Sequence, residues 1–300
     1  MTHLKILAPS KINLILRVSQ KRANGYHDIC SLFHRISLCD EIEIQTKTRA
    51  GLNLVTSGNK VPKGKENIIS KAYEALCRQI KSKPGLVVSL KKRIPTGSGL
   101  GGGSSDAASF LLGANRLLNL KLSRNVLLRL GAQVGSDVPF FIEDTAFALV
   151  EGRGEKLQKL DCKQSYFFVI VSFKKGFSTK EMYEDLDRKS WQPVSLTSVR
   201  ANVKLCASLL NHQQLTQAKR FFRNDFLPVA EEKLSQISKV IRTWSQQDIP
   251  CLLSGSGSSV FAVFKNKLLA LNQAKRLKKQ RDLKVFVAES FRHSIHAKKR

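Results

Sequence analysis

The chain has 300 residues, 42% of them hydrophobic, and its 51 Lys and Arg against 23 Asp and Glu give a formal net charge of +28. This length allows a large core and favours two domains, and the lack of a long apolar run excludes a membrane-crossing helix. The N-terminus lacks the apolar core of a secretory signal, and the six cysteines form no C-x-x-C pair. We therefore expect a cytoplasmic protein with reduced thiols, without a disulfide framework or a zinc site.

The first half of the chain mixes strand and helix patterns, which favours an α+β fold class. A turn at 152–155 ends this half, and we place a domain boundary directly after it. The patterns predict strands at 4–7, 11–18, 41–45, 51–55, 85–90 and 145–151, and helices at 67–79, 106–118 and 123–134.

The segment before the helix predicted at 106–118 carries the strongest local signal. Residues 95–105 read Pro-Thr-Gly-Ser-Gly-Leu-Gly-Gly-Gly-Ser-Ser. Glycine lets successive N–H groups converge on one point, and the following helix adds free amides and the positive end of its dipole. A flexible surface loop would not normally run at once into an amphipathic helix. The segment therefore predicts a phosphate-binding loop.

Other phosphate motifs fit this loop poorly. Residues 97–102 satisfy the dinucleotide pattern G-x-G-x-x-G, but they lie far from the first strand, and no acid closes a second strand after them. A Walker loop requires a lysine where this chain has Gly102, Gly103 and Ser104. The His-Arg-Asp and Asp-Phe-Gly motifs of protein kinases are also absent.

The second half has the element order of a split βαβ layer. It also carries two basic runs, Lys275–Arg281 and Lys298–Arg300, which make nucleic acid a rival partner. Nucleic-acid modules usually interleave aromatic residues with basic ones, and these runs contain none. We interpret the runs as a solvated helix face and a chain tail, and expect no nucleic-acid partner despite the charge of +28. The elements predicted here are strands at 165–171, 259–264 and 284–288, helices at 196–210, 215–220 and 231–246, and a basic helix before the last strand.

The glycine-rich segment has two companions in the chain. Residues 8–14 read Ala-Pro-Ser-Lys-Ile-Asn-Leu, and residues 253–261 read Leu-Ser-Gly-Ser-Gly-Ser-Ser-Val-Phe. With Ile94-Pro95 and the glycines that follow, this order of motifs resembles the GHMP kinases, the superfamily of galactokinase, homoserine kinase and mevalonate kinase. The resemblance implies ATP as co-substrate, Mg²⁺, and a two-domain α+β fold. Residues 1–155 would form a ribosomal-protein-S5-domain-2-like domain, and residues 156–300 a ferredoxin-like domain.

Four further motifs narrow the resemblance to one branch of these kinases. They are Lys11-x-Asn13-Leu14, Asn-Gly-Tyr-His at 24–27, Gly-Ser-Asp-Val-Pro at 135–139 and Asn-Asp-Phe at 224–226. They are similar to the branch that phosphorylates the 2-hydroxyl of 4-diphosphocytidyl-2-C-methyl-D-erythritol, giving the 2-phosphate and ADP, in the non-mevalonate isoprenoid pathway. We expect a monomer or weak homodimer. A kinase for another small alcohol, such as homoserine or a sugar, and a nucleic-acid-binding protein on a degenerate kinase fold are the alternatives.

The resemblance assigns catalysis to Lys11 and Asp137. Phosphoryl transfer needs charge neutralisation on the moving group and a side chain that orients or deprotonates the hydroxyl. Asp137 would be the general base or aligning carboxylate, and Lys11 would favour its charged form and neutralise the phosphoryl group. Without the ordered motifs, Asp137 would be interpreted as a turn residue and Lys11 as a lysine at a strand edge.

The resemblance also assigns the acceptor contacts. Tyr26 and Tyr183 would stack on cytosine and His27 would supply its hydrogen bonds, while Asn13 and Thr179 would hold the erythritol end. We expect the loop at 254–259 to shape the acceptor side of the site.

For ATP, the resemblance assigns the phosphates to the glycine-rich segment. Ser105 is our candidate for a magnesium contact, and the other metal ligands are left open because no metal-binding acid is identified. Asp106 fits less well, since its charge repels phosphate, and we expect its side chain to point away from the nucleotide. The expected ATP-binding residues are Asn67 and Lys92 near the adenine, and Pro95, Thr96, Gly97, Ser98, Gly99, Leu100, Gly101, Gly102, Gly103, Ser104 and Ser105 around the phosphates.

Overall fold

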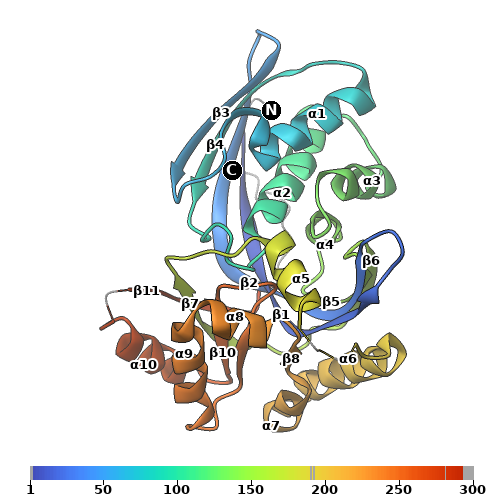
Figure 1. The fold of residues 1–300 in the computed structure, drawn as a ribbon. Coiled ribbons are helices and arrows are strands. Elements are labelled where there is room, and N and C mark those ends of the chain that lie inside the picture. The colour runs from blue at the N-terminus through green and yellow to red at the C-terminus, as the bar shows by residue number, and fades with distance from the viewer. Residues whose placement is uncertain (1–2, 190, 192, 281, 293–300) are drawn as a thin grey trace.

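The structure, a computed structural model, describes residues 3–189, 191, 193–280 and 282–292. A seven-stranded sheet occupies the upper part of Figure 1 and a four-stranded sheet the lower part, both with helices packed on them. The α+β class predicted from the sequence is confirmed. Within the described ranges, no helix is long and apolar enough to cross a membrane.

Two long antiparallel strands organise the larger sheet. The strands that we expected at 4–7 and 11–18 are both part of β1, whose pairing with β2 shifts register between Pro9 and Ser10. Proline has no N–H to donate to the ladder, so an irregularity at this position costs little. The order is β3-β4-β2-β1-β8, with β5 paired to β2 and β6 to β5. The bounds are β1 (His3–Lys21), β2 (His27–Thr46), β3 (Gly51–Gly58), β4 (Gly85–Lys92), β5 (Phe147–Gly152), β6 (Lys156–Leu160) and β8 (Arg223–Asn224).

Helices of the first half pack on this sheet and on one another. The α1 helix begins where the Asn67 side chain accepts a hydrogen bond from the Ile69 N–H (2.9 Å) and thereby caps the helix. The α4 helix follows Asp137 directly, was not expected, and is fully buried. The bounds are η1 (Gly64–Glu66), α1 (Ile68–Ile80), α2 (Gly102–Leu117), α3 (Arg124–Val134) and α4 (Val138–Ile142).

The smaller sheet is antiparallel throughout, in the order β11-β7-β10-β9. The single helix that we expected at 231–246 is two helices, because the chain is extended at Leu234 between them. The α5 helix was not expected. The remaining bounds are β7 (Phe167–Phe173), α5 (Thr179–Asp187), α6 (Leu196–Asn211), α7 (Leu215–Ala218), η2 (Lys219–Phe221), α8 (Leu227–Lys233), α9 (Ser235–Ser245), β9 (Cys251–Leu253), β10 (Val260–Phe264), α10 (Lys267–Leu277) and β11 (Leu283–Glu289).

The two halves of the chain are interleaved at the sheets. The boundary that we expected after Glu155 falls in the turn between β5 and β6, and both strands belong to the larger sheet. That sheet also takes β8 from the second half. The division into two domains at this residue therefore stays a prediction. The first basic run, Lys275–Arg281, lies in α10 up to Leu277. Its last residue, Arg281, and the second run, Lys298–Arg300, lie outside the described residues.

Candidate active site

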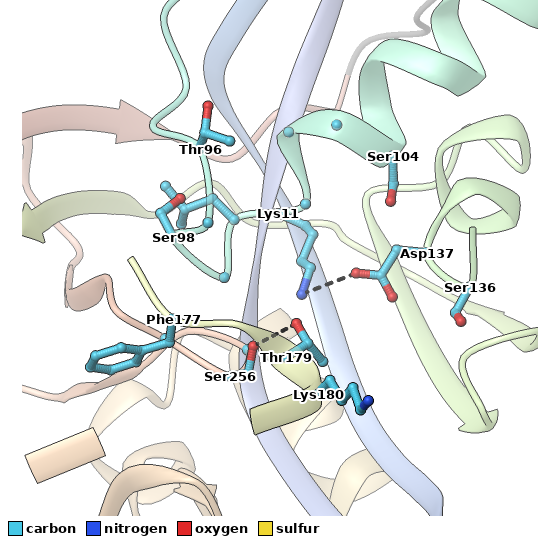
Figure 2. A pocket seen from close by; sticks show the side chains of 18 of the residues that line it. Lys11, Thr96, Ser98, Ser104, Ser136, Asp137, Phe177, Thr179, Lys180 and Ser256 are labelled. Atoms are coloured by element: carbon cyan, nitrogen blue, oxygen red, sulfur yellow. Dashed lines mark hydrogen bonds and ion pairs between the residues drawn. The ribbon is translucent and has the colours of Figure 1, made fainter. Parts of the chain in front are cut away.

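A cavity of about 840 Å³ brings together residues from both halves of the chain. Figure 2 shows Lys11 near its centre, with Asp137 and Ser104 on one side and Ser98, Phe177 and Ser256 on the other. Of the site residues expected from the sequence, only Ser105 does not line this cavity; its side chain is buried within α2.

The glycine loop, defined here as Pro95–Gly101, has the backbone of an anion-binding loop. Gly97, Gly99 and Gly101 have φ values of 64°, 76° and 68°, a left-handed conformation that glycine adopts without strain. Gly101 caps α2, and the helix starts at Gly102, four residues before the predicted start at Asp106. The loop thus leads directly into the N-terminus of a 16-residue helix, which favours a bound anion.

A second loop, Ser254–Ser259, holds the glycine loop from the other half of the chain. A Cβ at Gly99 would lie 1.9 Å from the Ser254 carbonyl oxygen, so the two backbones meet without room for a side chain. The Ser254 hydroxyl donates to the Gly99 carbonyl (3.0 Å), and the Ser259 N–H donates to the Ser98 carbonyl (3.0 Å). This loop also reaches the acceptor side, where Ser256 and Thr179 hydroxyls lie 3.1 Å apart.

Lys11 and Asp137 meet beside the glycine loop. Lys11 Nζ lies 3.4 Å from Asp137 Oδ2 and donates to Asn13 Oδ1 at 2.7 Å. The Lys11 N–H donates to the Leu100 carbonyl (2.9 Å), and a Cβ at Gly101 would come within 3.0 Å of the Lys11 side chain. The lysine is therefore buried against the loop, and Asp137, which precedes α4, remains partly exposed to the cavity.

Aromatic side chains form the opposite end of the cavity. This aromatic end consists of Tyr26, His27, Tyr183 and Phe226. The His27 ring stacks on Tyr183 with centroids 5.2 Å apart, and Tyr183 meets Phe226 edge-on at 4.8 Å. Burial raises the pKa of Tyr183, so its hydroxyl stays neutral. Tyr26 is 52% exposed, and the Arg153 guanidinium lies 4.0 Å from its ring centroid.

His27 has one hydrogen bond and one carboxylate neighbour. Its Nδ1 lies 2.8 Å from the Ser19 carbonyl oxygen, and its Nε2 lies 3.0 Å from Asp187 Oδ1 at the end of α5. Asp187 also pairs with Lys21 at 2.7 Å. These contacts connect α5 to the hairpin of β1 and β2 at the mouth of the cavity.

Comparisons with known proteins agree with this geometry. Residues 67–145 match the family model described as the GHMP kinases N-terminal domain. The 4-diphosphocytidyl-2-C-methyl-D-erythritol kinase of Geobacter sulfurreducens is 36% identical, over 93% of this chain and 96% of that protein. The enzyme of the same name from Carboxydothermus hydrogenoformans is 35% identical, over 87% of this chain and 88% of that one. The chain belongs to the 4-diphosphocytidyl-2-C-methyl-D-erythritol kinase family.

Solved structures show the same fold. A crystal structure of 4-(cytidine 5'-diphospho)-2C-methyl-D-erythritol kinase aligns with a TM-score of 0.77 at 26% identity, covering 96% of this chain and 99% of that one. Homoserine kinase from Cytophaga hutchinsonii aligns with a TM-score of 0.76 at 18% identity, covering 97% and 95%. The second comparison shows the shared fold alone, and both confirm the expected GHMP kinase fold.

Several residues of this family member's cavity were not predicted. Phe177 donates its N–H to the Gly97 carbonyl (3.1 Å). Val61, Pro62 and Ile68 form an apolar wall near Asn67, whose side chain donates to the Pro62 carbonyl (2.9 Å). Lys21, Arg153 and Lys180 add positive charge to the lining. Hydrophobic periodicity could not identify these residues because they lie in connecting segments and at the ends of strands and helices.

The Asn-Asp-Phe motif at 224–226 has supporting contacts. The Asn224 amide donates to the carbonyls of Leu253 (2.9 Å) and Gly255 (2.8 Å), which fixes the second loop. Asp225 accepts from Arg17 Nε and the Val18 N–H, both at 2.7 Å, and its burial raises its pKa. The motif thus anchors the second half of the chain to β1.

A buried charge cluster lies beside the glycine loop. Lys92 Nζ donates to Asp40 at 2.5 Å and to Asp106 at 2.6 Å, and all three side chains are nearly inaccessible. Burial raises the pKa of Asp106 to about 8, and Asp40 acts in the same direction while Lys92 opposes it. Lys92 was expected near the adenine; it lines the cavity, but two of its N–H groups are directed to carboxylates.

Proposed function

We propose that the protein transfers the γ-phosphoryl group of ATP to the 2-hydroxyl of 4-diphosphocytidyl-2-C-methyl-D-erythritol, giving the 2-phosphate and ADP. The observation that carries this proposal is the Lys11–Asp137 pair, 3.4 Å apart, between the glycine loop and the aromatic end of one cavity. A phosphate-binding loop on one side and stacking surfaces on the other support a nucleotide donor and a cytidine-bearing acceptor.

Asp137 and Lys11 would carry the transfer. Asp137 orients the hydroxyl and accepts its proton, and the Lys11 ammonium neutralises charge that develops on the transferred phosphoryl group. Asn13 holds Lys11 in place through the 2.7 Å contact, and its own amide donates to the Ser31 hydroxyl (2.9 Å). The amides of the glycine loop and the N-terminus of α2 bind the remaining phosphates.

The aromatic end would recognise the cytidine part of the acceptor. Tyr26 and Tyr183 offer ring faces for stacking. The hydrogen bond from His27 to cytosine stays a prediction, and it would replace one of the contacts of its ring nitrogens with Ser19 and Asp187. Thr179 and Asn13 line the same cavity and would hold the erythritol end near the transferred phosphate. Lys21, Arg153 and Lys180 line the same cavity and give positive charge for the diphosphate of the acceptor.

We propose Mg²⁺ as the metal that accompanies ATP. The described part of the chain contains no group of three or more His, Cys, Asp or Glu side chains that could hold a metal. Mg²⁺ commonly binds through one or two protein oxygens together with phosphates and water, and the Ser104 hydroxyl, in the first turn of α2 and beside the cavity, would supply one such oxygen. The metal would neutralise phosphate charge during transfer. The contact from Ser105 stays a prediction, as do the cytoplasmic location and the monomer or weak homodimer.

Turnover of the cytidyl substrate with ATP, followed by product mass, tests the function. We expect Asp137→Ala to lower kcat about 100- to 10,000-fold, the range for loss of a general base, with ATP binding retained. Asp161→Ala removes an exposed carboxylate outside the cavity and is the matched control, expected to match the wild type. Free CMP should compete with the acceptor, and homoserine should not be phosphorylated. Turnover of homoserine with no inhibition by CMP would contradict the proposal.

A further inference from the structure

The buried charge cluster of Asp40, Lys92 and Asp106 joins both ends of the glycine loop. Asp40 lies on β2 and accepts from the N–H groups of Arg93 (2.6 Å) and Ile94 (2.8 Å), the two residues directly before the loop. Asp106 lies in the second turn of α2, which follows the loop. Lys92 connects the two carboxylates at 2.5 and 2.6 Å.

The loop itself has little intrinsic rigidity. Its three glycines with positive φ lose more conformational entropy on ordering than other residues would. The second loop holds its middle, at Ser98 and Gly99. The charge cluster holds its two ends, and the Lys92 ammonium lies directly beneath the helix start, 2.9 Å from where a Cβ of Gly102 would be.

Stability alone explains such a cluster poorly. The side chains of Asp40, Lys92 and Asp106 are 0%, 2% and 2% exposed. Desolvating charged groups is costly, and replacing a buried ionic cluster by apolar residues is often neutral or stabilising. Geometric specificity is one role for which such clusters are retained.

We propose that Asp106, held by Lys92 and Asp40, is a positioning residue that fixes the ends of the glycine loop so that its amides converge on the polyphosphate of the nucleotide. The inference rests on the proposed function only in taking ATP as the donor. In this proposal the cluster positions the loop and does not contact the adenine. The affinity lost on disrupting it should therefore depend on the number of phosphates in the nucleotide.

The protonation of Asp106 agrees with this role. Two carboxylates and one ammonium would place a net negative charge beneath a loop that binds phosphates. Burial raises the pKa of Asp106 to about 8, so a proton on this carboxyl leaves the cluster neutral near pH 7. Asp106→Asn keeps this neutral shape and an oxygen acceptor for Lys92. It is therefore the conservative variant, expected to retain wild-type nucleotide affinity.

Calorimetric titration of the full chain with AMP, ADP and a non-hydrolysable ATP analogue tests the proposal. We expect Asp106→Ala to weaken binding of ADP and the analogue about 10- to 100-fold, the loss expected when one hydrogen bond to a charged phosphate is broken, and to leave AMP binding unchanged. Asp106→Asn should restore the affinity. Asp144→Asn is the matched control, because it removes one carboxylate from a buried ion pair with Arg35 outside the cavity, and nucleotide affinity should not change.

Two results would overturn the proposal. An equal loss for AMP, ADP and the analogue would mean that Asp106 and Lys92 contact the nucleoside instead. Unchanged affinity for all three in folded Asp106→Ala would mean that the cluster does not position the loop. If Asp106→Ala fails to fold, Asp106→Ser, which leaves a smaller void and keeps a polar group, takes its place. Because these titrations need no acceptor, a wrong acceptor assignment would appear in the turnover assay and not here.

Discussion

The two ends of the cavity are built in different ways. The nucleotide end is one continuous segment, the glycine loop and the start of α2, and it presents backbone N–H groups. The aromatic end collects side chains from distant segments: Tyr26 from the turn between β1 and β2, His27 from the start of β2, Tyr183 from α5, and Phe226 from directly before α8.

This difference determines which substitutions each end can tolerate. A backbone site depends on φ angles and on the absence of Cβ atoms, so it is sensitive to the smallest added side chain. A side-chain site depends on ring faces and polar atoms, so it is sensitive to truncation. Lys11 and Asp137 lie between the two ends, and loss of either end should leave this pair in place.

Among changes to the two ends, the largest effect should come from adding one methyl group to the nucleotide end. In Gly99→Ala the new Cβ would meet the Ser254 carbonyl oxygen at 1.9 Å, and φ of 76° would be strained. The loop must move away from the second loop, and a displacement of about 1 Å can cost about 100-fold in rate. We expect a loss of about that size in kcat/KM for ATP, measured by steady-state kinetics.

Gly97→Ala is the matched control for that change. Its φ of 64° is also left-handed, but the nearest atom to its Cβ would be 3.7 Å away. It carries the strain of about 1–2 kcal/mol without the collision, so stability should fall while kcat/KM changes little. Equal kinetic losses in both variants would show that φ strain, and not contact with the second loop, determines the effect.

A smaller effect should come from truncating the aromatic end. Tyr26→Ala removes an exposed ring that Arg153 covers at 4.0 Å, and loss of one stacked ring costs about 1–3 kcal/mol. We expect KM for the cytidyl substrate to rise about tenfold, at the lower end of that range, while KM for ATP stays unchanged. Tyr26→Phe keeps the ring and should behave as the wild type. A rise in KM for ATP would contradict the separation of the two ends.

The contiguous parts of the molecule were the ones that sequence could predict. The glycine-rich segment encodes its own backbone, so its left-handed φ values could be expected from its composition, while its phosphate-binding role stays a prediction. The side-chain contacts could not be predicted without the fold, because they join residues that are far apart in the sequence. Lys92 and Asp40, for example, are 52 positions apart. The α5 helix was missed because only Met182 and Leu186 in it are buried, which leaves a weak apolar pattern.

The position at which α2 starts explains why Ser105, alone among the expected site residues, lies outside the cavity. Starting α2 at Gly102 turns the Ser105 side chain inward, where it is fully buried, and leaves Ser104 beside the cavity. Glycine has low helix propensity, so the sequence placed the helix start at Asp106. A Cβ at Gly101 would meet Lys11 at 3.0 Å, and a Cβ at Gly102 would meet Ile94 at 2.8 Å and Lys92 at 2.9 Å, so the close packing at this helix start leaves room only for glycine despite its low propensity.

The smallest effect concerns the fold and neither end of the cavity. His34 is buried between Phe147 and Phe168, with Nε2 2.8 Å from the Ser290 hydroxyl, and burial lowers its pKa to about 3. The unfolded chain therefore binds a proton below about pH 6.5 that the folded chain excludes. His34 thus lowers stability by up to about 1.4 kcal/mol per pH unit as pH falls from about 6.5 towards 3, and has no such effect above that range. Denaturant unfolding of wild type and His34→Gln across this range measures the difference, since the variant keeps an acceptor for Ser290 but does not titrate. A constant difference in unfolding free energy would contradict the prediction, whereas unchanged KM values at neutral pH would separate this core histidine from both ends of the cavity.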